Sequence, residues 1–312
     1  MLTLTNIFYM KNLAPIALFA YNRPEHLERT LRSLAANALA SSSDLFIFSD
    51  GPKTDKDKKN VDAVRSLIRA VTGFKSVKIV ENSVNVGLAE NIINGVTTLV
   101  NNHGKVIVME DDLESSLYLL QYMNDALNFY EHNEQVMHIG AYMYPINPEA
   151  LPETFFFRLV TSSGWATWKR AWDYFEPDIE KLNTRFDKEK IHAFSIEGTE
   201  NFWKIFREFR AGKNNSWATR WYAGVFLQNG LALHPAKSMT NNIGHDASGT
   251  HSGVSDMYAV TVADKPINFF PADIRENEEA VERIKHFFRT RKGSWYQRGK
   301  RYAATRIKKL LR

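Results

Sequence analysis

The stretch Lys105-Val106-Ile107-Val108-Met109-Glu110-Asp111-Asp112 decides both the fold class and the position of the functional site. Its four consecutive apolar residues, three of them β-branched, are typical of a strand that is buried on both faces. Three carboxylates follow this strand, and ionised carboxylates are costly to bury without a cation. Because ligands of open α/β sheets bind at the carboxyl ends of strands, we expect a metal ion here. The alternative is a solvated strand end that is merely acidic.

The composition limits the class of protein. The chain has 312 residues, 44% of them hydrophobic, which is enough for one large α/β domain or two modest ones. It has no cysteine, which excludes disulfides, thiolate nucleophiles and cysteine-ligated zinc. No apolar run approaches the length of a membrane span. We interpret the apolar run 13–21 as a first strand rather than a signal peptide, because Asn22-Arg23-Pro24-Glu25 ends it without a cleavage site.

Strand and helix patterns alternate through the first half of the chain. In the first helix we expect Asn22 as the cap and Pro24 in the first turn. Four strand–helix units predict a mostly parallel, doubly wound α/β sheet with right-handed crossovers. A later segment, 241–253, is rich in glycine and in ligand-type side chains, which is typical of a functional loop. Strands are expected at about 14–21, 45–48, 77–80, 105–109, 136–139 and 155–160, and helices at about 24–34, 53–71, 88–100, 116–132, 199–211 and 217–228.

A series of motifs follows successive strands. They are Phe19-Ala20-Tyr21-Asn22-Arg23-Pro24, Asp50, Asn85-Val86-Gly87-Leu88-Ala89-Glu90-Asn91, Glu110-Asp111-Asp112, Gly164-Trp165-Ala166-Thr167-Trp168 and the loop 245–251. In this order they resemble glycosyltransferases of the GT-A fold, above all family-2-type enzymes and the N-acetylglucosaminyltransferase I group. The resemblance covers about residues 14–255. It implies a GT-A domain over residues 12–270, in which 14–145 bind a nucleotide-sugar and 150–270 bind the acceptor.

The resemblance implies a divalent cation, Mn²⁺ or Mg²⁺, that offsets the charge of the leaving diphosphate as a Lewis acid. In the relatives the last Asp of the acidic triplet ligates the metal, which corresponds to Asp112. Glu110 and Asp111 would then face the ribose and a metal-bound water. His251 or His245 would complete the metal shell, although a lone loop histidine is often simply exposed.

The same resemblance implies a donor site for a UDP-sugar. Backbone at Ala20-Tyr21-Asn22 and the carboxylate of Asp50 would hold the base, with Asp50 accepting from the uracil imide N–H. Asn85 and Asn91 would line the start of the donor helix, and Gly164-Trp165 would pack beneath the donor sugar. Each has a structural alternative, namely a cap for Asn22, turns for Asp50 and Asn85, and an aromatic core segment for Gly164-Trp165. The residues expected at the donor, besides Glu110 and Asp111, are Ala20, Tyr21, Asn22, Arg23, Asp50, Asn85, Asn91, Gly164 and Trp165.

One motif departs from the pattern. Inverting relatives carry an Asp or Glu as general base in a segment that resembles Trp217-Ala218-Thr219-Arg220-Trp221, where this chain has Ala218. Ala218 cannot take a proton, although Arg220 and the flanking tryptophans match. There are three alternatives. Another carboxylate serves, with Asp246 the nearest in kind, or the protein is a pseudo-glycosyltransferase that binds donor without turnover, or Ala218 is itself a substitution that disables the base. A sugar nucleotidyltransferase is disfavoured, because no glycine-rich loop follows the first strand.

The C-terminal tail carries most of the basic charge. Residues 281–312 contain twelve Lys and Arg but only one acid, Glu282, so the rest of the chain is acidic overall. We expect residues 275–312 to form a basic amphipathic helix on an anionic membrane surface, and nucleic acid is not expected because the acidic body would repel it. A solvated helix is the alternative. The resemblance implies an enzyme that extends a glycan or lipid-linked acceptor in cell-surface polysaccharide synthesis. Together with the basic tail, it predicts a cytoplasmic location, peripheral on the inner face of a bacterial membrane.

Overall fold

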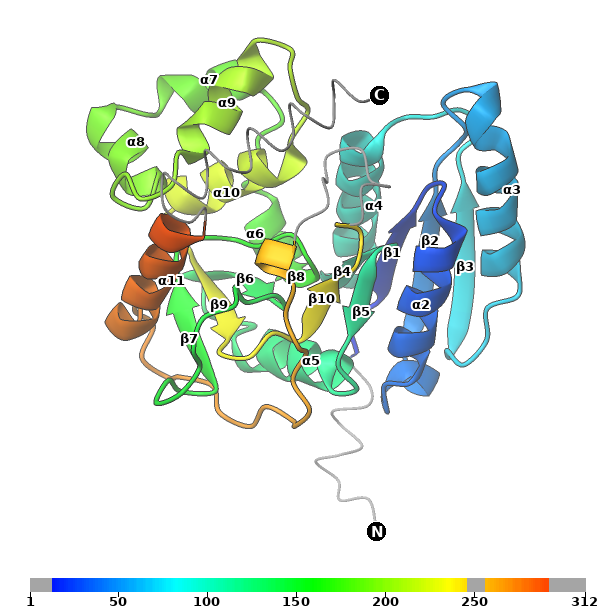
Figure 1. The fold of residues 1–312 in the computed structure, drawn as a ribbon, viewed down its shortest axis with the longest axis horizontal. Coiled ribbons are helices and arrows are strands. Elements are labelled where there is room, and N and C mark those ends of the chain that lie inside the picture. The colour runs from blue at the N-terminus through cyan, green and yellow to red at the C-terminus, as the bar shows by residue number, and fades with distance from the viewer. Residues whose placement is uncertain (1–12, 246–255, 292–312) are drawn as a thin grey trace, which may run out of the picture.

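A single eight-stranded sheet forms the centre of the molecule (Figure 1). The computed structural model describes residues 13–245 and 256–291. The strands are β1 (Ile16–Ala20), β2 (Asp44–Ser49), β3 (Ser76–Glu81), β4 (Lys105–Glu110), β5 (Leu113–Ser115), β6 (Val136–Gly140), β7 (Thr154–Phe157), β8 (Trp165–Trp168), β9 (Leu231–Pro235) and β10 (Thr240–Asn242). The sheet order is β3-β2-β1-β4-β8-β6-β9-β7, and β10 and β5 form a separate two-stranded sheet.

Six of the eight central strands run in the same direction. β1 pairs in parallel with both β2 and β4, while β8 pairs antiparallel with β4 and β6, and β7 pairs antiparallel with β9. The expected mostly parallel α/β sheet is therefore confirmed. The segment Trp165–Trp168, where no strand was expected, is a strand between β4 and β6. The sequence did not indicate this strand because its pairing partners lie far away along the chain.

Helices cover both faces of the sheet. The helices are α2 (Pro24–Ala35), α3 (Asp55–Arg69), α4 (Leu88–His103), α5 (Leu119–Phe129), α6 (Lys169–Trp172), α7 (Ile179–Thr184), α8 (Lys188–Phe194), α9 (Phe202–Arg210), α10 (Trp217–Leu227) and α11 (Glu278–Thr290), with short 3-10 turns at Ala40–Ser42 and Asp256–Tyr258. The patterns at 199–211 and 217–228 are confirmed as α9 and α10. Helices α7 and α8 were not predicted, although Asp178 and Asp187 cap them in the usual way.

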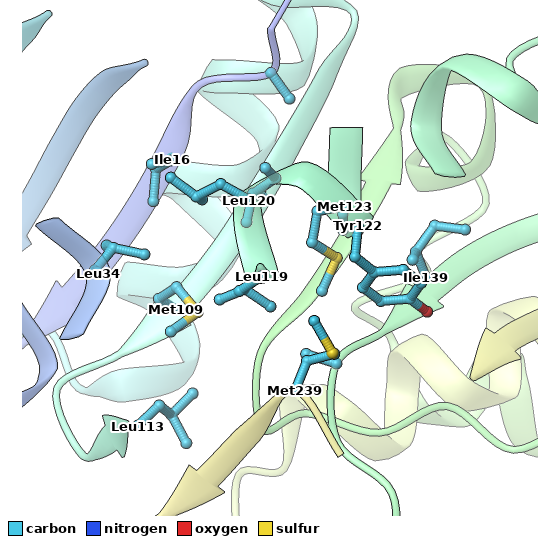
Figure 2. Close-up of a cluster of buried hydrophobic side chains, with 14 of the residues drawn as sticks. Ile16, Leu34, Met109, Leu113, Leu119, Leu120, Tyr122, Met123, Ile139 and Met239 are labelled. Atoms are coloured by element: carbon cyan, nitrogen blue, oxygen red, sulfur yellow. The ribbon is translucent and has the colours of Figure 1, made fainter. Parts of the chain in front are cut away.

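Two hydrophobic clusters lie on opposite faces of the sheet. The first packs α2, α3 and α5 against the strands, and Figure 2 shows side chains of the strands, such as Ile16 and Met109, meeting Leu119 and Leu120 of α5. The second packs α4, α6 and α10 against the other face. Each fully buried aliphatic side chain of this kind contributes about 1.5–3 kcal/mol. This burial fixes the strand ends that carry the candidate site.

The start of α2 differs from the expected cap. Arg23, not Asn22, occupies the N-cap position, and Pro24 is the first helical residue, as expected. The Asn22 side chain instead donates a 3.0 Å hydrogen bond to Asp57 in the first turn of α3. The cap expected of Asn22 was therefore misplaced by one residue, and Asn22 ties the end of β1 to α3.

The beginning of the basic tail belongs to the protein core. Helix α11 buries Val281, Ile284 and Phe288 in a third cluster, with residues of β7 and of α7 to α10. Figure 1 shows α11 lying against β7 and β9. The segment from residue 281 is thus not a separate tail up to residue 290, and the basic residues from 292 onward lie outside the described residues. In the ranges 13–245 and 256–291, no helix is both long and apolar enough to cross a bilayer.

Candidate active site

The acidic triplet at the end of β4 is bound to an internal cation. Nη2 of Arg23 lies 2.8 Å from Oδ1 of Asp111 and 2.9 Å from Oδ2 of Asp112. The three side chains are only 19%, 7% and 12% exposed, respectively. The sequence predicted a cation at this strand end, and in the structure a guanidinium provides that charge. Because each ion pair is largely shielded from water, it is stronger than an exposed pair would be.

Backbone groups hold both aspartates in place. The backbone N–H of Tyr21 donates to Oδ2 of Asp111 at 3.1 Å, and the Thr30 hydroxyl donates to the Asp111 carbonyl at 3.0 Å. The backbone N–H of Ile243 donates to the Asp112 carbonyl at 2.9 Å. At Gly244 an added Cβ would lie 2.2 Å from Oδ2 of Asp112, so any larger residue would collide with this carboxylate. The segment 240–244 therefore forms one wall of the site.

The charges of the triplet are strongly coupled. Desolvation, followed by the charges of Asp112 and Asp111, raises the pKa of Glu110 to about 8, and Arg23 only partly opposes this. Desolvation also raises the pKa of Asp111, against the opposing charge of Arg23. For Arg23, desolvation lowers the pKa, but the two aspartates together raise it above its ordinary value. Burial and mutual repulsion within the triplet thus favour the protonated form of Glu110, and the Arg23 guanidinium offsets only part of the charge of the two aspartates.

The oxygen atoms at this site are of the type that binds a divalent cation, but the described residues bring too few of them together to form a complete metal site. Carboxylate oxygens are the hard ligands that Mg²⁺ and Mn²⁺ prefer, and no hydrogen bond from the described residues reaches Oδ1 of Asp112. Within those residues, however, no group of three His, Cys, Asp or Glu side chains is arranged to hold a metal. His245 lies with its ring 6.0 Å from that of Tyr258, while Asp246 and His251 lie outside the described residues.

Asp50 joins two strand ends to the start of α4. Its Oδ1 accepts hydrogen bonds from the backbone N–H of Gly51 at 2.9 Å and of Val86 at 3.0 Å. The side chain of Asn82 also donates to this oxygen at 3.2 Å, and the N–H of Gly87 donates to Oδ2 at 2.9 Å. A carboxylate at a helix N-terminus is favoured by the helix dipole. A uracil imide would therefore have to compete with four donors for this buried group.

The two asparagines expected at the donor helix belong to the same network. The Asn85 side chain donates to the carbonyl of Gly51 at 2.8 Å, and Asn91 accepts from Asn82 at 3.3 Å. At Gly51 an added Cβ would lie 2.4 Å from the Val84 carbonyl carbon, so the two loops approach too closely for any side chain. Asn85 thus lies just before α4 and Asn91 in its first turn, as expected, and their contacts there are structural.

The backbone of the first motif is also largely engaged. The carbonyl of Ala20 accepts from the N–H of Asp50 at 3.0 Å, which continues the pairing of β1 with β2. The Tyr21 hydroxyl accepts from the backbone N–H of Lys53 at 3.1 Å. Desolvation is the main cause that raises the pKa of Tyr21. These contacts place the first motif beside the second, as the sequence predicted.

Gly164 and Trp165 are packed inside the protein. The Trp165 side chain is fully buried, stacked 5.3 Å from Trp217 and 5.4 Å from His138. Gly164 has a φ of +82°, and an added Cβ would lie 3.0 Å from a Thr240 methyl carbon. The geometry agrees with the aromatic-core alternative, because a fully buried indole is not available to a donor sugar.

A cavity of about 510 Å³ shares the wall segment 242–245 with the acidic triplet. Asn242 and His245 line it, and Asn242 pairs with Leu113, the residue that follows Asp112. Its other walls come from α9, α10, the end of α11 and the loop before β8. Six tyrosine and phenylalanine rings contribute apolar surface, namely Tyr142, Tyr144, Phe202, Tyr222, Tyr258 and Phe288. Such a mixture of aromatic and polar groups can bind a polar molecule that also has apolar faces.

The segment expected to carry the general base is at the cavity, but its arginine is not. Ala218, in the first turn of α10, lines the cavity. Arg220 is buried elsewhere, with hydrogen bonds of 3.1 Å to the Pro177 carbonyl and 3.0 Å to Asn215, and with its guanidinium over the Phe209 ring. Desolvation lowers the pKa of Arg220. Its bonds hold the start of α10 in place.

Two carboxylates in the cavity wall were missed by the sequence reasoning. Glu200 and Glu208 both line the cavity, and Glu208 lies within the predicted helical stretch 199–211. The sequence could not single out Glu208, because only the packing of α9 beside α10 brings it to the same cavity as Ala218. The pairing of Arg23 with the acidic triplet was missed for a similar reason, although both motifs had been noted.

The sequence matches glycosyl transferase family 2 over residues 16–203. No curated protein matches the chain. Among solved structures, it is similar to the mannosyltransferase PcManGT from Pyrobaculum calidifontis in complex with GDP-Man and Mn²⁺, at 12% identity and a TM-score of 0.37, over 71% of this chain and 76% of that one. It is also similar to S. aureus TarS, at 13% identity and a TM-score of 0.38, over 72% of this chain and 36% of that one.

The family match alone carries the assignment, since it spans more than half of the 312 residues. The matched segment contains all strands from β1 to β8, including the acidic triplet at the end of β4. The mostly parallel sheet with helices on both faces is the GT-A fold that the sequence predicted. The chain therefore belongs to glycosyl transferase family 2.

Proposed function

We propose that the protein transfers a sugar, with inversion, from a UDP-sugar to a hydroxyl group of a glycan or lipid-linked acceptor. One observation supports this most strongly: the acidic triplet at the end of β4 adjoins a cavity of about 510 Å³ through the segment 242–245. A donor diphosphate at the triplet and an acceptor in the cavity would place the two substrates side by side. Proximity of this kind is a large part of the catalysis of group transfer.

The residues at the strand end would bind and orient the diphosphate. Asp112 would hold Mn²⁺ or Mg²⁺, with Asp111 beside it, and His245 or His251 would be a further ligand. When bound, such an ion offsets the charge that develops on the leaving diphosphate. The Arg23 guanidinium, which is bonded to Oδ2 of Asp112, would repel such an ion. Displaced by the ion, it would offer a second positive charge near the diphosphate.

The identity of the nucleotide and the place of action are further parts of this proposal. The preference for UDP rests on the order of the motifs, because the carboxylate of Asp50 is engaged by backbone N–H groups of the protein and does not itself support the imide contact. The likeness to the N-acetylglucosaminyltransferase I group suggests a hexosyl or N-acetylhexosaminyl donor. We place the enzyme in the cytoplasm at the inner face of a bacterial membrane, in cell-surface polysaccharide synthesis. The support is the basic sequence after residue 291.

Thermal stabilisation by nucleotide-sugars tests the proposal. UDP- and GDP-sugars would each be added with Mn²⁺ or with a chelator. A ligand at a hundred times its Kd adds about 2.7 kcal/mol to the free energy of unfolding. We expect stabilisation by a UDP-sugar with Mn²⁺, followed by release of UDP when an acceptor is added. Stabilisation by none of the nucleotide-sugars would contradict the proposal.

A second candidate function is a pseudo-glycosyltransferase that binds a donor without turnover. The observation that favours it is Ala218, which places a methyl group in the cavity wall where relatives have an acid. The same assay separates the two functions, because a pseudoenzyme would be stabilised by donor but would release no UDP.

A further inference from the structure

The cavity beside the donor site contains carboxylates other than the one that the family motif lacks. Among the described residues that line it, the acids are Glu200 and Glu208. A general base for transfer must reach the acceptor hydroxyl and must have a lone pair that is not already engaged. The two glutamates differ in this respect.

Glu200 is committed to an ion pair. It pairs with Nη2 of Arg291, whose side chain is only 7% exposed, and Arg291 also donates to the Tyr258 hydroxyl. The Arg291 guanidinium lies over the rings of Tyr258 and Phe288. A carboxylate that neutralises a buried arginine cannot give up its charge without leaving that arginine unpaired. Glu200 therefore has a structural task at the wall of the cavity.

Glu208 has no comparable partner. Its closest cation is Lys204 on the same helix, with 3.6 Å between Nζ and Oε1, which is too long for a hydrogen bond. Both side chains are largely open, at 62% for Lys204 and 39% for Glu208. An exposed pair of this kind contributes little. In the described part of the chain, no hydrogen bond to the Glu208 carboxylate is present, so its oxygens remain available to a substrate.

Glu208 and Ala218 reach the same cavity from neighbouring helices. Glu208 lies in the last turn of α9 and Ala218 in the first turn of α10, and the loop 211–216 connects the two helices. Figure 1 shows α9 and α10 side by side above the sheet. The carboxylate absent from α10 is thus replaced, within one cavity, by a carboxylate from α9.

We propose that Glu208 is the general base of the transfer reaction, which rests on the proposed function above. The Glu208 carboxylate takes the proton of the acceptor hydroxyl while that oxygen bonds to the anomeric carbon of the donor. The bond from the anomeric carbon to the diphosphate oxygen breaks, and the nucleoside diphosphate leaves with the electron pair. A wild-type chain with Ala218 is then an active enzyme and not a pseudoenzyme.

Variants of the 312-residue chain test this assignment with two readouts, transfer to an acceptor and slow hydrolysis of the donor by water. We expect Glu208→Gln to lower kcat for both reactions by about 10²–10⁴, the usual contribution of a general base. The donor Kd should stay within about twofold of wild type and the Tm within about 2 °C, because the side chain is part-exposed and makes no hydrogen bond to a described residue. The matched control is Glu189→Gln, the same change on the exposed surface of α8. The double variant Glu208→Gln, Ala218→Asp should regain at least about a tenth of the lost rate, because the carboxylate introduced on α10 would enter the same cavity.

Each other outcome has a separate meaning. If the wild type turns over and Glu208→Gln retains its rate within about fivefold, well short of a general-base effect, Glu208 is not the base. Loss of the rate in Asp246→Asn but not in Glu208→Gln would assign the base to Asp246. If Glu208→Gln loses donor affinity or free energy of unfolding by an amount that accounts for its loss of rate, the role of Glu208 is structural. If the wild type binds donor but neither transfers nor hydrolyses it, the proposed function itself fails.

Discussion

Nη2 of Arg23 donates a 2.9 Å hydrogen bond to Oδ2 of Asp112, which lies 89 residues further along the chain. The same nitrogen also bonds to Asp111 at 2.8 Å. A cation of the protein thus occupies the space beside the carboxylate that is expected to ligate a metal. Metal binding and this ion pair must compete, and the competition can be measured.

Arg23→Gln should strengthen Mn²⁺ binding while weakening the metal-free fold. Removing one partner of a shielded ion pair costs about 3 kcal/mol, the lower end of the range for buried pairs. Mn²⁺ affinity of the variant, measured by calorimetry without donor, should rise at least about tenfold, equivalent to 1.4 kcal/mol. Arg29→Gln, which breaks an exposed pair with Glu114, is the control. Equal Mn²⁺ affinity in wild type and Arg23→Gln would exclude the competition.

Asp50→Ala should act on stability more than on specificity for the base. The change leaves the part-buried backbone N–H groups of Val86 and Gly87 without their acceptor, and a fully buried N–H in that position would cost about 1–3 kcal/mol. Because water reaches these two groups in part, urea denaturation should show a total loss of about 1–2 kcal/mol. If Asp50 instead reads the uracil imide, Asp50→Ala would keep its stability and lose its preference for UDP over other nucleotides.

The sequence predicted the strand ends well because their signal is local. Continuous apolar runs identified the first strands, and the acid, asparagine and arginine side chains that follow them do gather at one end of the sheet. What each side chain contacts there was not predictable, since the partners of Arg23 lie 88 and 89 residues away. Asp50 similarly bonds to backbone groups 36 and 37 residues away.

Two other features show where a sequence pattern has more than one explanation. Val281, Ile284 and Phe288 recur at helical spacing, and this pattern fits a core helix as well as it fits a membrane-surface helix. Only the packing of α11 against the third cluster decides between them. Trp165–Trp168 is too short a run to identify a strand, and its neighbours β4 and β6 come from separate parts of the chain.

The buried histidines should make the fold less stable in mild acid. Burial lowers the pKa of His234 to about 4, against its hydrogen bond to the Leu159 carbonyl, and burial also lowers the pKa of His138. Since the folded pKa lies below the unfolded one, the contribution of His234 is complete above pH 6.5 and is lost as the pH falls toward 4. Between pH 7.5 and 5.5 the loss is about 1.4 kcal/mol for this histidine.

Urea denaturation at these two pH values measures this effect. His234→Gln should lose less stability than wild type on acidification, whereas the exposed His132→Gln should behave like wild type. If His234→Gln loses as much free energy of unfolding as wild type between pH 7.5 and 5.5, His234 does not stay neutral in the fold.

Two truncations separate the core helix from the basic sequence after it. A chain that ends at residue 291 loses eight Lys and Arg and no acid, and should fold but bind anionic vesicles much more weakly. Vesicle binding of the full chain should also weaken with salt, because charges are screened within about 8–10 Å at physiological ionic strength.

A chain that ends at residue 280 should fail to fold, because it loses Val281, Ile284 and Phe288 from the core. Each of these side chains contributes about 1.5–3 kcal/mol. Circular dichroism and cosedimentation with vesicles report the two effects separately. Vesicle binding by the chain ending at 291 that equals that of the full chain would leave the basic sequence without a membrane role.

Calorimetric titration of UDP and of a UDP-sugar into wild type and Asp112→Asn, with Mn²⁺ and with chelator, tests the central claim most directly. If the end of β4 is the donor site, wild type should bind with Mn²⁺ and lose at least about a hundredfold, or 2.7 kcal/mol, in chelator. Asp112→Asn should show the weak binding in both conditions, with Asp62→Asn on the exposed surface of α3 as the control. Binding of equal strength in wild type and Asp112→Asn, with or without Mn²⁺, would contradict the claim that the acidic triplet holds the donor diphosphate through a metal ion.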